Sequence, residues 1–174
     1  MNITNISTVI AKPKSREDIR NIALEVRKLI EYENKPFFPI VEFIEYVLTN
    51  PEFKDSAELI ILEPDEMRDT YGTTNTGKNV ISIRRDVYEG AVKGNPRDRF
   101  TLCHEVGHYL LHQPKCISYA RGSVPKYCDP EWQANTFAGE LMAPRNLIQD
   151  MSIEEIMQKC GMSYQAAAIQ YNMK

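Results

Sequence analysis

Apolar side chains recur at helical spacing in the first fifty residues of the chain. Ser15, with Asp18 three residues later, forms a good N-terminal cap. We therefore expect an amphipathic helix from Ser15 to about Asn34, ended by Pro36. Residues 39–48 carry a second apolar face and predict another helix. The apolar face of the first helix consists of Ile19, Ile22, Ala23, Val26, Leu29 and Ile30.

Two apolar runs in the middle of the chain predict strands. Residues 59–62 are all aliphatic and predict a short buried strand, whereas residues 79–84 alternate in part and predict a second strand. The stretch 70–78 is rich in Thr, Gly and Asn, which favours a turn. Residues 86–92 predict one or two helical turns.

Two helices in the second half begin with the same signal. Asn95-Pro96 and Asp129-Pro130 each place a capping side chain before a proline at the first helical position. The first helix is expected to end before Pro114 and the second before Pro144. Between them, the polar stretch 114–128 predicts a loop.

The last part of the chain predicts two short helices. Ser152 and Glu155 form a capping box, Gly161 closes that helix, and Ser163 caps the last one. We expect residues 150–174 to form a C-terminal helical hairpin. Its few basic residues favour packing over contact with DNA.

Length and composition favour one globular domain. The chain has 174 residues, which suits a single domain, 1–174, with residues 1–14 as a loosely ordered leader. The net charge is −3 and the isoelectric point is near 5.7. This balance argues against broad nucleic-acid binding by neutralisation of phosphates.

The sequence predicts a cytoplasmic protein without membrane contact. The start of the chain lacks a basic segment followed by an apolar stretch, and no run approaches the ~20 apolar residues of a membrane span. The four cysteines form no Cys-x-x-Cys pair, so we expect them to be reduced and structural. Cys103 is interpreted as a core residue.

All three histidines fall within nine residues, and two of them belong to a His-Glu-x-x-His motif. On a helix, His104 and His108 leave the same face one turn apart, which lets both bind one Zn²⁺ ion. Glu105 lies beside the first ligand and is predicted to be the catalytic base. Gly107 inside the helix costs about 1 kcal/mol against alanine and would allow another element to approach closely.

A catalytic zinc site usually has a third protein ligand, and Glu131 is our choice. It lies in the first turn of the next helix, which has small neighbours on the same face. Asp129 is better explained as a helix cap, and Glu140 points half a turn away from Glu131. His112 would stretch the ligand set over about 12 Å of helix, so we interpret it as a second-sphere or helix-end residue.

These groups predict zinc-assisted hydrolysis of an amide bond. Zinc would polarise the carbonyl and lower the pKa of water toward ~7, while Glu105 accepts the proton and passes it to the leaving amine. The residue that stabilises the oxyanion stays open among Tyr119, Tyr127 and Arg145. The strand over 80–83 is a candidate for pairing with an extended substrate.

Two blocks of the sequence resemble the ImmA/IrrE family of metallopeptidases. Residues 99–112 resemble the Phe-Thr-Leu-Ala-His-Glu-Leu-Gly-His block, and residues 131–144 resemble the block Glu-x-x-Ala-Asn-x-Phe-Ala-x-Glu-Leu-Leu-Met-Pro. The resemblance covers roughly residues 95–145. In this chain Cys103 stands where alanine is common in the family.

The resemblance implies a small α+β zincin-like fold, with a short sheet packed against the motif helix and further helices at both ends. It implies zinc held by His104, His108 and Glu131, with Glu105 catalytic. It also implies a protein partner, a helix-turn-helix repressor encoded nearby, as the substrate. A non-proteolytic antirepressor with a structural zinc is the alternative, and a DNA-binding regulator is a more distant one.

Overall fold

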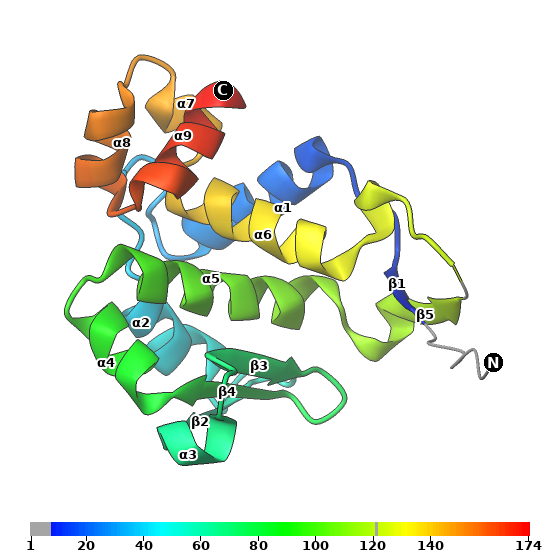
Figure 1. Ribbon diagram of the computed structural model, residues 1–174. Coiled ribbons are helices and arrows are strands. Elements are labelled where there is room, and N and C mark those ends of the chain that lie inside the picture. Colours follow the sequence, from blue (N-terminus) through cyan, green and yellow to red (C-terminus); the bar gives the residue numbers. More distant parts are fainter. Residues whose placement is uncertain (1–7, 121) are drawn as a thin grey trace.

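Helix α5 (Pro96–Leu111), which carries the His-Glu-x-x-His motif, runs through the middle of the molecule in the computed structural model (Figure 1). The structure describes residues 8–120 and 122–174. The strands are β1 (Thr8–Ala11), β2 (Glu58–Leu62), β3 (Gly72–Asn75), β4 (Val80–Arg84) and β5 (Ile117–Ala120). The other α-helices are α1 (Arg16–Leu29), α2 (Ile40–Phe43), α3 (Pro64–Met67), α4 (Arg85–Val92), α6 (Pro130–Met142), α7 (Arg145–Ile148), α8 (Ile153–Cys160) and α9 (Tyr164–Asn172). Shorter helical segments are η1 (Ile44–Leu48), η2 (Pro114–Cys116) and η3 (Lys126–Cys128).

The elements form two layers with α5 between them. Figure 1 shows α6 and α1 on one side of α5 and the sheet β2-β4-β3 on the other. Strand β4 is the central strand, parallel to β2 and antiparallel to β3, and its Ile81 and Ile83 are fully buried. The structure thus confirms the predicted α+β class, with a short sheet packed against the motif helix.

The caps of the two central helices are the predicted ones. The Asn95 side chain accepts hydrogen bonds from the backbone N–H groups of Arg97 and Asp98, and Asp129 accepts one from Glu131. Because these caps satisfy N–H groups that have no partner within the helix, they fix where α5 and α6 begin.

Four sequence expectations are corrected. The predicted turn over 70–78 contains strand β3, because the threonines pair with β4. Strand β2 is only half buried, because it lies at an edge of the sheet. The expected loop 114–128 contains β5, which pairs with β1, so residues 8–11 of the expected leader are a strand. Residues 1–7 of that leader lie outside the described residues.

The fourth correction concerns the N-terminal helices. Helix α1 ends at Leu29 because the chain turns at Glu31, whose φ is +58°, and the guanidinium of Arg27 then donates to the Tyr32 carbonyl. The expected helix over 39–48 is a single turn, α2, followed by η1, which is a wider π-helical turn. None of the helices in the described part of the chain combines the length and apolar character that a membrane span requires.

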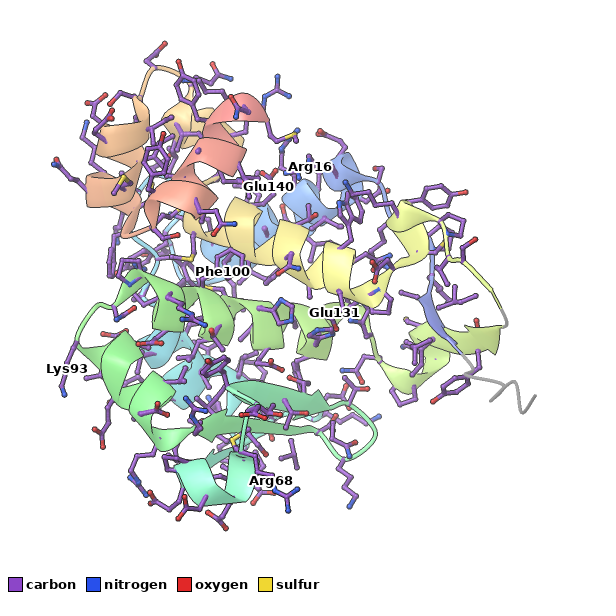
Figure 2. The ribbon with its side chains drawn as sticks, in the orientation of Figure 1. Arg16, Arg68, Lys93, Phe100, Glu131 and Glu140 are labelled. Carbon is purple, nitrogen blue, oxygen red and sulfur yellow. The ribbon has the colours of Figure 1, made fainter. Side chains whose placement is uncertain are left out.

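Helices α1 and α6 are joined by charged groups, of which Arg16 and Glu140 are labelled in the upper half of Figure 2. The side chain of Glu140 is 1% exposed and accepts hydrogen bonds from Arg16 at 3.0 Å and from Arg20 at 3.1 Å. Burial lowers the pKa of Arg27 to about 10, and its guanidinium donates to the Leu141 carbonyl. Glu140 therefore has a structural role and faces away from Glu131, as its spacing along the helix predicts.

Helices α5 and α6 approach closely because small residues face each other. A Cβ atom added at Gly107 would lie 3.2 Å from both the Cα and the carbonyl oxygen of Ala134 and 3.1 Å from the ring of Phe137. Ala134 and Ala138 are completely buried. This contact explains the glycine inside the motif helix.

The first prediction concerns this contact. In Gly107→Ala the helix gains about 1 kcal/mol of propensity, but overpacking against the α6 backbone costs roughly 1–3 kcal/mol. We expect a net fall in the free energy of unfolding, measured by urea denaturation. The control is Gly77→Ala, where the new Cβ would make only an ordinary contact at 3.4 Å. An alanine at position 107 that leaves stability unchanged or higher would show that the helices are not in this close contact.

Candidate metal centre

The two motif histidines and Glu131 meet between α5 and α6. The Nε2 atoms of His104 and His108 are 2.9 Å apart. The Glu131 carboxylate lies 3.4 Å from His104 Nε2 through Oε2 and 3.2 Å from His108 Nε2 through Oε1. Figure 2 shows Glu131 reaching from the N-terminal turn of α6 toward α5. One ligand atom from each residue lies within 4.8 Å of the others.

The donor set fits a zinc ion. Imidazole nitrogens and a carboxylate oxygen bind Zn²⁺ at about 2.0–2.2 Å, and in a tetrahedral site such atoms are separated by about 3.3 Å. The three observed separations, 2.9, 3.2 and 3.4 Å, lie close to that spacing. The side chain of Glu131 is 68% exposed, which leaves one side of the cluster open. The arrangement thus has the form of a three-ligand site with an accessible position.

The Glu131 carboxylate and the His104 imidazole stabilise each other's charged forms. Hydrogen bonds to His104 and His108 hold the pKa of Glu131 far below its usual range. Burial tends to lower the pKa of His104, but the hydrogen bond to Glu131 and the negative charges of Glu105 and Glu131 outweigh it, so that its pKa is raised. The Glu131 carboxylate thus favours the protonated form of His104, and a divalent cation at this position would take the place of that proton.

The second ring nitrogen of each candidate ligand also has a partner. His104 Nδ1 lies 3.0 Å from Asn135 Oδ1, and His108 Nδ1 lies 2.9 Å from His112 Nδ1. Burial, followed by the electrostatic interaction with His108, lowers the pKa of His112 to about 4. His112 is the C-terminal cap of α5 and lies behind His108, outside the cluster of three ligand atoms. Such partners orient the imidazoles that hold a metal.

Strand β3 holds Glu105 in place. The Glu105 side chain is buried, and Thr74 Oγ1 donates to its Oε2 at 2.7 Å. A Cβ atom at Gly72 would lie 2.8 Å from Glu105 Cγ, so only glycine fits there without displacement. Among the described residues, Oε1 has no hydrogen-bond partner. Strand β3 and helix α5 both border a cavity of about 290 Å³. This cavity is lined by Gly72, Thr73, Thr74, His104, Glu105, His108 and Glu131.

Other sequence candidates lie elsewhere. Tyr119 and Tyr127 are more than half exposed, and neither they nor Arg145 line this cavity, so the fold does not bring these three candidates for oxyanion stabilisation to the cluster. Cys103 is fully buried, and burial raises the pKa of its thiol to about 12, in agreement with a core role. The described cysteines are all free.

Four residues around the site were not identified from the sequence: Gly72, Thr74, Gln133 and Asn135. Asn135 follows Glu131 by four residues, so helical spacing already placed it on the face of the candidate ligand. The β-branched threonines in β3 carried a strand signal that the surrounding Gly and Asn residues obscured. Gln133 gave no signal, because its role depends on contacts far apart in the sequence.

Comparison with known proteins places the site in a family. The peptidase M78 family model, described as the IrrE N-terminal-like domain, matches residues 57–172. That range runs from β2 to α9 and contains every candidate site residue, whereas β1 and α1 lie outside it. A comparison with curated proteins finds no match. Because the family model covers well over half of the chain, the protein belongs to the peptidase M78 family of hydrolases.

Proposed function

We propose that this protein is a zinc-dependent endopeptidase in which His104, His108 and Glu131 hold the ion and Glu105 acts as general base. The observation that carries the proposal is the convergence of two imidazole nitrogens and a carboxylate oxygen within 4.8 Å, beside a cavity that Glu105 also lines. Membership of a peptidase family supports the reaction class.

The chemistry follows from the positions of the side chains. Zinc in such a site supplies a Lewis acid, which polarises a carbonyl and lowers the pKa of water. Because Thr74 Oγ1 donates a hydrogen bond to Glu105 Oε2, the other oxygen, Oε1, is available to accept a proton from the attacking water. The same carboxyl group then passes that proton to the nitrogen of the leaving amine. The hydrogen bond from Thr74 and the space left by Gly72 place Glu105 on the cavity wall.

The proposed substrate is a cytoplasmic protein, a helix-turn-helix repressor encoded nearby. The support is the resemblance of residues 99–112 and 131–144 to a family with that role. The expectation that the strand over 80–83 pairs with substrate is corrected, because β4 is bonded on both sides, to β2 and β3. Among the described strands, β3 is the edge that borders the cavity, and an extended peptide can add to such an edge.

The second prediction separates cleavage from masking. Glu105→Gln keeps the shape of the side chain and removes its basicity, so we expect cleavage of the repressor to fall by about 10²–10⁴-fold. Zinc content should remain that of the unmodified protein, because Glu105 is not a proposed ligand. The measurement is the rate of repressor cleavage on gels, with metal content measured in parallel.

Glu89→Gln on α4 is the matched control, since it makes the same change at an exposed residue outside the cavity. It should cleave at the normal rate. If Glu105→Gln still relieves repression in cells as fully as the unmodified protein does, the protein acts by masking its partner, and the proposal of a protease fails.

The affinity of the site for zinc is expected to depend on pH. Because the pKa of His104 is raised, protons should compete with zinc for this ring, and as the pH is lowered the affinity for zinc should begin to fall at a pH above the ordinary histidine pKa of about 6.5. Calorimetric titrations in two buffers of different ionisation enthalpy would measure the released proton. An affinity that stays constant from pH ~8 to ~5.5 would be inconsistent with histidine ligands.

A further inference from the structure

The orientation of the Gln133 amide is fixed by its surroundings. Gln133 is completely buried, and its Nε2 donates to the Lys12 carbonyl and the Tyr127 carbonyl, each at 2.8 Å. An amide NH₂ has two donors and no acceptor, so these bonds use both hydrogens. In the reversed orientation the amide oxygen would face two carbonyl oxygens. Oε1 must therefore point the other way, where His112 Nε2 lies 3.1 Å from it.

This orientation determines where His112 carries its proton. Oε1 of Gln133 can only accept a hydrogen bond, so His112 Nε2 must be the nitrogen that bears hydrogen. In the neutral ring the other nitrogen, Nδ1, then has a free lone pair. That lone pair faces His108 Nδ1 at 2.9 Å.

The next link is His108. Because His112 Nδ1 is an acceptor, His108 Nδ1 must be the donor of this hydrogen bond. The remaining nitrogen of His108, Nε2, is the one that lies beside His104 and Glu131. A chain of three hydrogen-bonding groups thus runs from two backbone carbonyls to the candidate metal site.

We propose that Gln133 and His112 are positioning residues that keep hydrogen on His108 Nδ1, so that Nε2, which lies beside His104 and Glu131, is the nitrogen left to bind an ion. The expected effect on zinc affinity rests on the proposed zinc site. The placement of hydrogen on His112 Nε2 and His108 Nδ1 does not depend on it. Lys12 follows β1 and Tyr127 belongs to η3, so the relay also ties the histidine to a segment that precedes α5 and to the connection between α5 and α6.

Long-range ¹H–¹⁵N spectra of the metal-free protein test the proton pattern directly. The chain has only three histidines, so the signals can be assigned by substitution. Near pH 8, above the ordinary histidine pKa of about 6.5, we expect His112 to carry hydrogen on Nε2 alone and His108 to carry it on Nδ1. Hydrogen on His112 Nδ1 would overturn the proposal, whether or not the protein binds zinc.

Zinc affinity tests the consequence. His112→Phe keeps a ring but removes the acceptor, and we expect the dissociation constant, measured by competition with a chelator, to rise about 10–100-fold. His112→Gln supplies an amide oxygen to His108 Nδ1 and should restore most of the affinity. A phenylalanine variant that folds and binds zinc as tightly as the unmodified protein would contradict the relay.

Gln133→Met tests the first link, and Gln113→Met is its matched control. The side chain of Gln113 donates to the Tyr109 carbonyl at the same end of α5. Gln113→Met therefore also removes a glutamine side-chain hydrogen bond there, but one outside the relay. We expect Gln133→Met alone to produce a mixture of His112 tautomers and weaker zinc binding. Unmodified protein that takes up no zinc yet shows the expected protons would refute the zinc enzyme and leave the relay standing. Tight zinc binding by a protein whose His112 carries hydrogen on Nδ1 would refute the relay and leave the zinc enzyme standing.

Discussion

The close contact between α5 and α6 at Gly107 is the constraint on which the site depends. The missing side chain lets the Ala134 backbone approach so closely that an added Cβ atom would lie 3.2 Å from it and would have to push it back by a few tenths of an ångström. Glu131 lies one turn before Ala134 on α6, and His104 and His108 flank Gly107 on α5. Close packing therefore brings the carboxylate within 3.4 Å of both imidazoles without a dedicated loop. The buried pairing of Glu140 with Arg16 and Arg20 anchors the other end of α6.

Each functional group is supported from a different side. Strand β3 fixes Glu105 from the sheet, through Thr74 and the space left by Gly72. Helix α6 supplies the partners of both imidazoles, Asn135 directly and Gln133 through His112. Supporting groups of this kind hold reacting side chains in position and are as necessary as the groups themselves. The site is thus a junction of the two layers of the fold.

Local signals in the sequence were sufficient to predict the two central helices and to single out three side chains that the fold brings together. The Asn95 and Asp129 caps, the spacing of His104 and His108, and the acidic first turn of α6 are all short-range features. What failed depended on long-range pairing: β3 and β5 are strands only because β4 and β1 lie beside them. The early end of α1 likewise depends on buried contacts of Arg27. Supporting residues such as Gln133 could not be recognised before the chain was folded.

The central claim is that one zinc ion is held by two imidazoles of α5 and one carboxylate of α6. Zinc K-edge X-ray absorption of the loaded protein tests this claim most directly. The account predicts one zinc per chain, with nitrogen and oxygen neighbours at about 2.0–2.1 Å and the outer scattering of two imidazole rings. A sulfur neighbour at about 2.3 Å, the signal of a single imidazole, or the absence of stoichiometric zinc would contradict it.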